Sequence, residues 1–393
     1  MSADNDNASS TIPKRLTILG ATGSIGSTAL ELLDHAPEHF DLVAVTAMNN
    51  VDKLIAIARR YHPKFVAIGN PEHFNTLKNA LADTSIQVAG GESGVLEAAN
   101  YPTDIVLSAI VGAAGLKPTL NAIRQGARIA LANKECLVCA GDLMLTEIQE
   151  HNATLIPVDS EHSAIYQVFD FIHPETVEAI ILTASGGPFR DRTYAEMQNV
   201  TLDEALKHPN WDMGAKITVD SATMMIKGLE LIEAYHLFPV SESQIEIIVH
   251  PESIIHSMVR YRDGSTLGQM GQPTMVTPIA FALSHPTRMH SPCPPLNLAQ
   301  TGQLTFKAPD EKRFPALRLA REALQCGASA PIILNAANEI AVQAFLDQRI
   351  GFLDITATVE KMLEKLPAQT VASLDDVEAI DTMVRIKTME LLD

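Results

Sequence analysis

A glycine-rich turn near the start of the chain limits the possible folds more than any other feature. In KRLTILGATGSIGSTALELL, at residues 14–33, an apolar strand pattern leads into Gly20, Gly23 and Gly26 and then into a helical pattern. Glycines at this spacing let the backbone approach a pyrophosphate, to which the helix N-terminus offers N–H groups and a positive dipole end. The motif predicts a dinucleotide site, with a turn used only for close packing as the alternative. The residues expected along the phosphates are Thr22, Gly23, Ser24 and Ile25.

The end of the second expected strand indicates which dinucleotide is bound. NAD-selective sites usually place Asp or Glu there, to accept a hydrogen bond from the ribose 2′-hydroxyl. Here the strand ends at Ala47, Met48, Asn49 and Asn50, whose neutral side chains tolerate a 2′-phosphate. The sequence therefore favours NADP, with Asn49 and Asn50 as candidate contacts, although no Arg stands in this loop.

Short apolar runs alternate with amphipathic helical stretches over residues 14–150. The candidate strands are LTILG, DLVAVTA, KFVAIG, DIVLSAI and RIALAN. This alternation is the signature of βαβ units and predicts an α/β domain with a doubly wound, Rossmann-like parallel sheet. The preceding residues 1–13 are mostly polar, and we expect a flexible tail there.

The pattern of predicted elements changes at TLIPVD, residues 154–159, and indicates a second domain over residues 151–284. It contains glycine-rich loops, one long helix near residues 223–238, and strands around QIEIIVH, IIHSMVRY and STLGQMG. The turn RDGS joins the last two strands as a hairpin. These features predict an α/β domain built on a mixed or antiparallel sheet.

Six prolines between His285 and Pro315, the latter included, interrupt any regular periodicity and predict an extended linker over residues 285–314. Helical spacing then returns in ALRLAREAL, PIILNAANEIAVQAFL, ITATVEKMLEKL and VEAIDTMVRIKTMELL. This spacing predicts a C-terminal helical bundle over residues 315–393.

Charge and hydropathy exclude several classes of protein. The chain carries 47 acidic and 29 basic side chains, a formal net charge of −18, which argues against nucleic-acid binding through phosphate neutralisation. No apolar stretch approaches the roughly 20 residues of a membrane span, and the polar N-terminus lacks a signal-peptide pattern. Four cysteines in 393 residues do not make a disulfide framework, so we expect a cytoplasmic protein.

Three acidic residues are candidate metal ligands. Asp159 and Glu161 flank Ser160 directly after a strand, and Glu230 lies in the helical run MMIKGLELIEAYHLF. Carboxylates two residues apart at a strand end converge on one cation if the chain turns there, and an all-oxygen ligand set selects Mg²⁺ or Mn²⁺ over zinc. The alternative is that these acids are solvated, as loop acids usually are.

Two segments are suited to bind an anion. TASGGPFR places Ser185, Gly186 and Gly187 after an apolar run, where a strand-end loop offers backbone N–H groups to phosphate. DSATMMIKG places Ser221 and Lys227 at the head of the helix that carries Glu230. A plain N-terminal cap for Ser221 and a surface position for Lys227 are the alternatives.

The segment HPNWDMGAK holds the single tryptophan, Trp211, and predicts a mobile loop near residues 206–216 that closes over a ligand. A rim aromatic packed on its own domain is the alternative. His208 and His256 are open to two interpretations, as ligand contacts or as hydrogen-bonded structural histidines.

These motifs occur in a specific order. GATGSIG, AIVGAAGL, LANKE, PVDSEH, SGGPFR, HPNWDMG, VDSATMM followed by KGLE, HPESIIHSMV and NAANE together resemble the 1-deoxy-D-xylulose-5-phosphate reductoisomerase family over nearly the whole chain. The resemblance implies a cytoplasmic homodimer with an N-terminal NADPH domain, a central catalytic domain with a mobile loop, and a C-terminal helical domain.

The resemblance also implies roles for individual residues. A divalent ion is held by Asp159, Glu161 and Glu230. The substrate is bound by Lys134, Ser160, Glu161, Ser185, His208, Ser221, Lys227 and Glu230, with His256 as a further candidate. Cofactor contacts come from Asn133, Glu135 and Gly214, and Trp211 and Met213 belong to the loop that closes over the substrate.

The implied reaction converts 1-deoxy-D-xylulose 5-phosphate to 2-C-methyl-D-erythritol 4-phosphate, a step of non-mevalonate isoprenoid synthesis. The metal acts as a Lewis acid on the ketone and adjacent hydroxyl oxygens of the substrate, and Lys134 adds positive charge beside them. NADPH then reduces the rearranged aldehyde by hydride transfer. A retro-aldol and aldol sequence and a single ketol migration both remain open.

The chain departs from the family pattern at two places. Met48 and Asn49 stand where the family usually has Gly and a basic residue before Asn50, which weakens the expected 2′-phosphate contacts. Ile226 stands where the family has an Asn that donates to the substrate. One helical turn separates Ile226 from Glu230, so we expect both side chains to face the substrate.

Two other functions remain open on the sequence. An NADP-dependent semialdehyde dehydrogenase on the same nucleotide fold needs a nucleophilic cysteine, for which Cys136 and Cys139 are the candidates. A non-catalytic NADPH-binding sensor keeps the fold but has lost turnover, and Ile226 is compatible with that loss.

Overall fold

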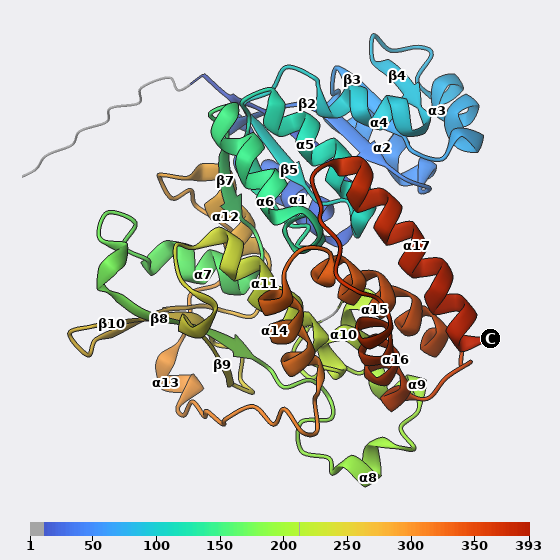
Figure 1. Cartoon of the computed structure of the whole chain (residues 1–393). Coiled ribbons are helices and arrows are strands. Elements are labelled where there is room, and N and C mark those ends of the chain that lie inside the picture. Colours follow the sequence, from blue (N-terminus) through green and yellow to red (C-terminus); the bar gives the residue numbers. More distant parts are fainter. Residues whose placement is uncertain (1–11, 212) are drawn as a thin grey trace, which may run out of the picture.

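The computed structural model describes residues 12–211 and 213–393 of the chain (Figure 1). Of the tail expected at residues 1–13, all but the last two residues lie outside the described part. Two β-sheets and a group of C-terminal helices make up the molecule, so the expected α/β class is confirmed. None of the described helices is both long enough and apolar enough to cross a bilayer.

Seven strands form the first sheet: β1 (Lys14–Leu19), β2 (Phe40–Ala47), β3 (Phe65–Ile68), β4 (Gln87–Gly90), β5 (Ile105–Ser108), β6 (Arg128–Leu131) and β7 (Thr154–Pro157). All neighbours are parallel, in the order β4-β3-β2-β1-β5-β6-β7. The strand order changes direction between β1 and β5, which is the switch point at which doubly wound sheets bind ligands. The expected Rossmann-like sheet is confirmed.

Two of these strands differ from the sequence-based prediction. The sequence pattern does not indicate β4, because its four residues are only partly buried and form no apolar run. The pattern assigns β7 to the second domain, but β7 pairs with β6 from Thr154 to Pro157. Backbone hydrogen bonds therefore place β7 at the edge of the first sheet, beyond the boundary expected at residue 150.

Helices cover both faces of this sheet. They are α1 (Ser24–His35), α2 (Val51–Tyr61), α3 (Phe74–Ala80), α4 (Gly91–Ala99), α5 (Leu116–Arg124) and α6 (Glu135–Glu150). Short 3-10 turns are η1 (Pro37–His39), η2 (Pro71–His73) and η3 (Ala113–Gly115) in this part, and η4 (Pro174–Thr176) and η5 (Glu242–Gln244) further on. Apolar residues of α4, α5 and α6 join one core cluster, whereas those of α1, α2 and α3 join another.

The second sheet has four strands: β8 (Val177–Ala184), β9 (Ile245–Val249), β10 (Ile255–Tyr261) and β11 (Thr266–Met270). Their order is β11-β10-β8-β9, with β8 and β9 parallel and the other pairs antiparallel, so the sheet is mixed. The hairpin expected at RDGS joins β10 to β11. Helix α7 (Ser160–Val168) follows β7 and packs on β10 and β11, which connects the two sheets.

The helices between β8 and β9 are α8 (Tyr194–Met197), α9 (Leu202–Ala205), α10 (Ala215–Ala222) and α11 (Met225–Leu237). The sequence predicts a single helix near residues 223–238 with Ser221 at its head. Instead, Met224 adopts a left-handed backbone with φ of 64° and separates α10 from α11. Ser221 therefore lies in the preceding helix.

The chain returns to the first sheet before the expected linker. In α12 (Val276–Ser284), Ile279 and Leu283 are fully buried, and the helix packs against α1. Residues 285–314 are extended except for α13 (Leu298–Thr301), and Lys307 pairs with Val249 next to β9. The linker prediction thus matches the backbone, but α12 belongs to the core of the first sheet.

Four helices complete the chain: α14 (Ala316–Cys326), α15 (Ala330–Leu346), α16 (Phe352–Lys365) and α17 (Leu374–Leu392). They agree with the four expected segments, and α17 packs mainly on α15 (Figure 1). Helix α6 packs against α11, α15 and α17, and these elements share one core cluster. The three parts of the chain are therefore joined through α6.

Candidate active site

A cavity of about 440 Å³ lies at the carboxyl edge of the first sheet. Segments that follow β1, β5, β6 and β7 line one side, and residues after β8 and on α10 and α11 line the other. Ligands of this fold usually bind outside the carboxyl ends of the strands. The expected site residues that line it are Gly23, Ser24, Ile25, Asn133, Lys134, Glu135, Asp159, Ser160, Glu161, Ser185, His208, Trp211, Met213, Gly214, Ser221, Ile226, Lys227, Glu230 and His256. The expected residues Gly20, Thr22, Asn49 and Asn50 lie outside its lining.

Three carboxylates converge in this cavity. Asp159 caps α7 by accepting the Ser160 N–H at 3.0 Å, and Glu161 lies in the first turn of the same helix. Glu230 comes from the middle of α11. One oxygen of each carboxylate lies within 4.8 Å of the other two, a spacing that a single divalent cation can span. The all-oxygen donor set fits a hard ion such as Mg²⁺ or Mn²⁺.

Two lysines pair with these acids, Lys227 buried and Lys134 partly buried. Lys134 Nζ lies 2.5 Å from Asp159 Oδ2 and 3.1 Å from Glu230 Oε1. Lys227 Nζ lies 2.8 Å from Glu161 Oε1 and also contacts Glu230 Oε2. Burial opposes ionisation of Asp159, but the Lys134 ammonium holds the pKa of that carboxyl well below its usual range. Burial and the neighbouring Glu161 instead raise the pKa of Glu230 to about 7.

Behind the acids lies a buried pair, His162 and Glu233, to which the sequence pattern assigns no role. Burial lowers the pKa of His162 to about 4, so the ring is neutral, and its Nε2–H donates to the Glu230 carbonyl at 2.9 Å. Its Nδ1 is then an acceptor, 3.2 Å from Glu233 Oε2. Burial raises the pKa of the Glu233 carboxyl well above its usual range. The pair holds α7 against α11 and thereby fixes Glu230.

The turn at Ser185, Gly186 and Gly187 forms the opposite end of the cavity. Both glycines have left-handed backbones, with φ of 80° and 68°. A Cβ on Gly187 would lie 2.6 Å from the Ser221 carbonyl oxygen, so only glycine allows this close approach to α10. The turn therefore sits beside Ser221, as expected for two parts of one anion site.

The loop after α9 is tied to this turn by His208. Its Nδ1 accepts the backbone N–H groups of Asn210 and Trp211 at 3.1 and 3.0 Å. Burial lowers the pKa of His208 to about 4, so the neutral ring carries its proton on Nε2 and donates to Ser185 Oγ at 3.0 Å. The Trp211 ring lies 6.4 Å from the ring of His256, which is also at the cavity. His208 is thus both a structural histidine and a cavity residue.

The glycine turn after β1 combines packing with an open helix end. A Cβ on Gly26 would lie 2.5 Å from the Gly20 carbonyl oxygen, so this glycine permits close strand–helix packing. Gly23 caps α1 without any side-chain hydrogen bond from the described residues, and Gly23, Ser24 and Ile25 line the cavity. The first-turn N–H groups of α1 therefore remain available to a pyrophosphate.

The residues that follow β2 do not line the cavity, and their side chains stabilise the local backbone instead. Asn50 caps α2 by accepting the Lys53 N–H at 3.1 Å, and Asn49 accepts from Asn70 Nδ2 at the same distance. Lys53, to which no sequence motif points, donates from its Nζ to the Thr22 carbonyl oxygen at 3.0 Å. This lysine, in the first turn of α2, places a cation next to the glycine turn.

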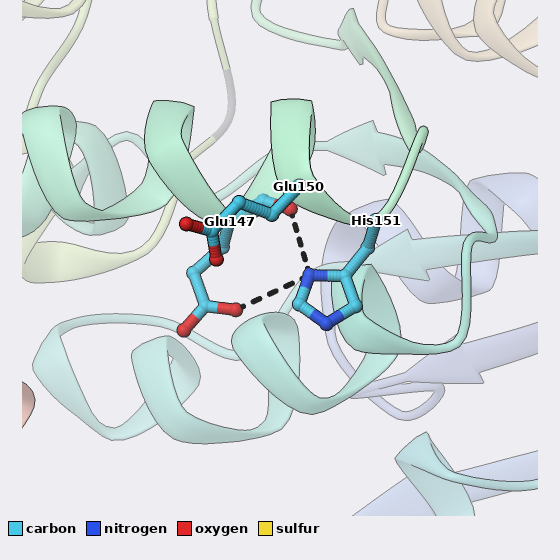
Figure 2. A group of neighbouring side chains, drawn as sticks. All are labelled: Glu147, Glu150 and His151. Atoms are coloured by element: carbon cyan, nitrogen blue, oxygen red, sulfur yellow. Dashed lines mark hydrogen bonds and ion pairs between the residues drawn. The ribbon is translucent and has the colours of Figure 1, made fainter.

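Another group of possible metal ligands lies at the far end of α6 (Figure 2). Glu147, Glu150 and His151 have potential ligand atoms within 4.8 Å of one another. However, Arg124 binds both carboxylate oxygens of Glu147, and His151 Nδ1 lies 3.0 Å from the Glu147 carbonyl oxygen. These contacts explain the group without an ion.

Cys136 and Cys139 lie in the first part of α6 and are buried. Burial raises the pKa of both thiols well above the usual value. A thiol that stays protonated is a poor nucleophile, and neither cysteine is among the residues that line the cavity. The structure thus gives no support to the semialdehyde dehydrogenase alternative.

Comparison with known proteins identifies the family. Residues 16–141 match the model for 1-deoxy-D-xylulose 5-phosphate reductoisomerase, and residues 155–238 and 270–387 match two C-terminal domain models of the same enzyme. The enzyme of that name from Rhodospirillum centenum is 55% identical over 379 residues, which cover 96% of this chain and 94% of the relative. This chain belongs to the 1-deoxy-D-xylulose 5-phosphate reductoisomerase family.

Further members of the reductoisomerase family agree in sequence and in fold. The Zymomonas mobilis enzyme is 51% identical over 97% of this chain and 98% of its own length. Its structure in complex with NADPH has a TM-score of 0.93 and 49% identity, covering 98% of this chain and 99% of that one. A structure of the reductoisomerase with NADPH, fosmidomycin and magnesium has the same TM-score at 43% identity, covering 96% of this chain and 98% of that one.

The contrast between the cysteines gives a first prediction. We expect an aromatic disulfide reagent to modify Cys293 and Cys326 quickly in the folded protein, because the first is partly exposed and the second exposed. Cys136 and Cys139 should react only after denaturation, since their thiols are buried and protonated. Thiolate release followed by absorbance measures this. A Cys326→Ser variant should lose one fast thiol, and fast reaction of all four would contradict the assigned burial.

Proposed function

We propose that this chain converts 1-deoxy-D-xylulose 5-phosphate to 2-C-methyl-D-erythritol 4-phosphate with NADPH and a divalent metal. The observation that carries the proposal is one cavity holding a glycine turn, a convergent triad of carboxylates and a glycine-rich strand-end turn. These are the three sites that a nucleotide, a metal and a phosphate require. Membership of the reductoisomerase family supports the assignment.

A divalent cation held by Asp159, Glu161 and Glu230 supplies Lewis-acid chemistry for the ketone and hydroxyl oxygens of the substrate. Lys134 Nζ lies within 3.1 Å of two of these acids and places a fixed positive charge beside the same oxygens. His162 and Glu233 keep Glu230 in place from behind. The chain thus brings preorganised charge to the atoms at which negative charge develops.

The remaining residues bind and enclose the substrate. The turn at residues 185–187, with Ser221 and Lys227, would hold the phosphate, and its Gly187 N–H donates to Ser185 Oγ at 3.2 Å. His208 joins this turn to the loop that carries Trp211 and Met213, and closure of that loop would exclude water from the hydride transfer that NADPH supplies. In this assignment residues 14–150 with β7 bind the cofactor, residues 159–275 bind the metal and the substrate, and the C-terminal helices support both.

One assay tests the proposed function and its alternatives. Protein, NADPH, Mg²⁺ or Mn²⁺ and 1-deoxy-D-xylulose 5-phosphate are mixed, and the absorbance of reduced nicotinamide is followed. We expect a loss of absorbance that depends on the sugar phosphate and stops when a chelator removes the metal. NADPH binding without turnover would instead support the sensor alternative.

Removal of one metal ligand should separate catalysis from cofactor binding. We expect Asp159→Asn and Glu230→Gln to lower kcat by roughly 100-fold or more, because each removes an anionic ligand from a hard cation. NADPH affinity, measured by nicotinamide fluorescence, should change by less than about twofold, since the glycine turn is a separate segment. Glu150→Gln, an exposed carboxylate at the other end of α6, is the matched control and should leave both quantities unchanged. A parallel loss of NADPH affinity in both variants would show that the metal site has been assigned to the wrong residues.

Cofactor choice gives a further prediction. We expect a higher kcat/KM with NADPH than with NADH, because no acid ends β2 and Lys53 places a cation near this edge. Lys53→Met should reduce this preference by roughly two- to fivefold, the range for an exposed ion pair, without changing turnover with NADH. Lys64→Met, at an exposed residue just before β3, is the control. Equal kcat/KM for both cofactors in the native chain would refute the NADP assignment.

Ile226 is expected to limit substrate binding. It lies in the first turn of α11, is partly buried and lines the cavity together with Lys227 and Glu230. An apolar side chain leaves a polar substrate atom without a partner there, which typically costs about 1–3 kcal/mol. Ile226→Asn should therefore raise kcat/KM roughly tenfold, mainly through KM, at saturating NADPH and metal. Ile226→Leu should leave it unchanged, and a lower kcat/KM in the Asn variant would show that another donor serves the substrate.

We further infer that the protein is a homodimer that pairs through the second sheet. Strand β11 ends this sheet, and at the opposite edge β9 is covered by the Lys307 bridge. Leu267 and Met270 are 49% and 38% exposed on β11, so the strand offers an open edge with apolar side chains. Such an edge normally needs a partner.

Sedimentation tests the dimer. We expect a mass of about twice 42.5 kDa for the native chain. Leu267→Lys should shift the equilibrium towards monomer, because charge on an edge strand opposes pairing. Ile386→Lys, an equally exposed apolar residue on α17, is the matched control and should leave the dimer intact. A monomeric native chain, or a Leu267→Lys dimer as tight as the native one, contradicts the proposal.

We also infer a reducing compartment such as the cytoplasm. All four cysteines are free, and Cys326 is exposed. Free thiols persist where glutathione and thioredoxin keep them reduced.

A further inference from the structure

Lys216 is a cation at the cavity that the proposed chemistry does not use. It is the second residue of α10, two positions after Gly214, and lines the same cavity as the acidic triad. Its side chain is 24% exposed. The sequence includes it only as the last residue of the loop expected near residues 206–216, and it takes no part in the proposed metal and phosphate sites.

Four side chains form a continuous relay through Lys216. Its Nζ lies 2.8 Å from Asp220 Oδ2 and 3.2 Å from Glu135 Oε1. The other oxygen of Asp220 accepts a hydrogen bond from Asn338 Nδ2 at 2.8 Å. Glu135 begins α6, Lys216 and Asp220 belong to α10, and Asn338 belongs to α15. The relay therefore joins the nucleotide side, the substrate side and the C-terminal helices.

The members of the relay depend on one another for charge balance. Asp220 and Asn338 are almost completely buried, and Glu135 is nearly so. Burial disfavours the charged form of Lys216, but Asp220 and Glu135 raise the pKa of its ammonium above the usual value. Because a buried charge without its partner is strongly disfavoured, the contacts are expected to shift together rather than singly.

Glu135 connects this relay to both halves of the cavity. It follows Asn133 and Lys134 directly in the chain. Asn133 Nδ2 donates to the carbonyl oxygen of Gly112 at 2.8 Å and so shapes the cavity wall after β5. Lys134 pairs with two acids of the triad. A movement of Glu135 must therefore displace the neighbours that serve the nucleotide and the metal.

We infer that Lys216 is a positioning residue that couples cofactor binding to substrate binding. When the nucleotide side is ordered, Glu135 holds Lys216, and Lys216 holds the start of α10, which carries Ser221 and follows the closing loop. Each ligand then strengthens the binding of the other by the same factor, as thermodynamic linkage requires. The inference rests on the proposed function, because it assumes that NADPH and a phosphosugar analogue share this cavity.

A linkage experiment tests the inference. The affinity for fosmidomycin, in the presence of Mg²⁺, is measured by calorimetry with and without saturating NADPH. We expect NADPH to tighten fosmidomycin binding about tenfold in the native protein. In Lys216→Met the factor should fall below about twofold, while the affinity for fosmidomycin alone changes less than about twofold. Lys216→Arg should restore most of the coupling, since it keeps the charge.

Two further variants separate coupling from general stability. Asn338 is not among the cavity-lining residues, so Asn338→Ala should weaken the coupling only through Asp220. Lys117 offers a matched control, because it also bridges acids from two parts of the chain, Glu92 and Glu378, at 3.2 and 3.3 Å. It is not among the cavity-lining residues, so Lys117→Met should leave the coupling factor at its native value.

The outcomes distinguish this inference from the proposed function. Native protein that binds neither NADPH nor fosmidomycin would overturn the function itself. Native protein that binds both, but with no coupling or with coupling unchanged in Lys216→Met, would overturn only the role of Lys216. A fall in both affinities without loss of the coupling factor would mark Lys216 as structural and would also refute the inference.

Discussion

The arrangement of this protein depends on the pairing of acidic and basic side chains that are largely withdrawn from water at the cavity. Asp159, Glu161 and Glu230 are held against Lys134 and Lys227, which leaves the five side chains with one net negative charge when all are ionised. Moving any one of these charges alone out of water would cost several kcal/mol, so each is placed in the interior together with its partners. Because the partners lie at the starts of α6 and α7 and in α11, this requirement fixes how the first sheet meets the second half of the chain. A divalent cation would enter a site whose ligands are already in position.

The first sheet supplies the place where these charges meet. Parallel strands end at one edge, so the loops after β1, β5, β6 and β7 converge without any special turn. The open end of α1 and the acids after β7 therefore share a cavity although they are separated by more than a hundred residues. Helix α6 leaves the same edge and packs on α11, α15 and α17, which transmits this geometry to the C-terminal helices.

Most ligand candidates could be predicted from the sequence, but their partners could not. Asp159 and Glu161 follow a strand, and the glycines around Ser185 follow another, so local pattern was sufficient to single them out. Lys216 and His162 lie in the segments HPNWDMGAK and PVDSEH, but the local pattern does not show what they or Glu233 contact, because a buried lysine or histidine on a helix has the same spacing as an exposed one. Their roles depend on contacts between residues that are distant in the chain, such as the contact of Lys216 with Glu135, 81 positions away.

The sequence by itself determined the glycine turn, the parallel first sheet and the C-terminal helices. It also predicted a second sheet, without deciding between mixed and antiparallel strands. Periodicity and turn residues are sufficient for this because they report on local backbone conformation. Only the tertiary structure decided that β7 pairs within the first sheet, that α12 packs into the core of that sheet, and that Met224 divides α10 from α11. It also decided which lysine neutralises which acid. Strand pairing, shared cores and buried charge depend on partners distant in the chain, and a local pattern reports that a face is buried but not what covers it.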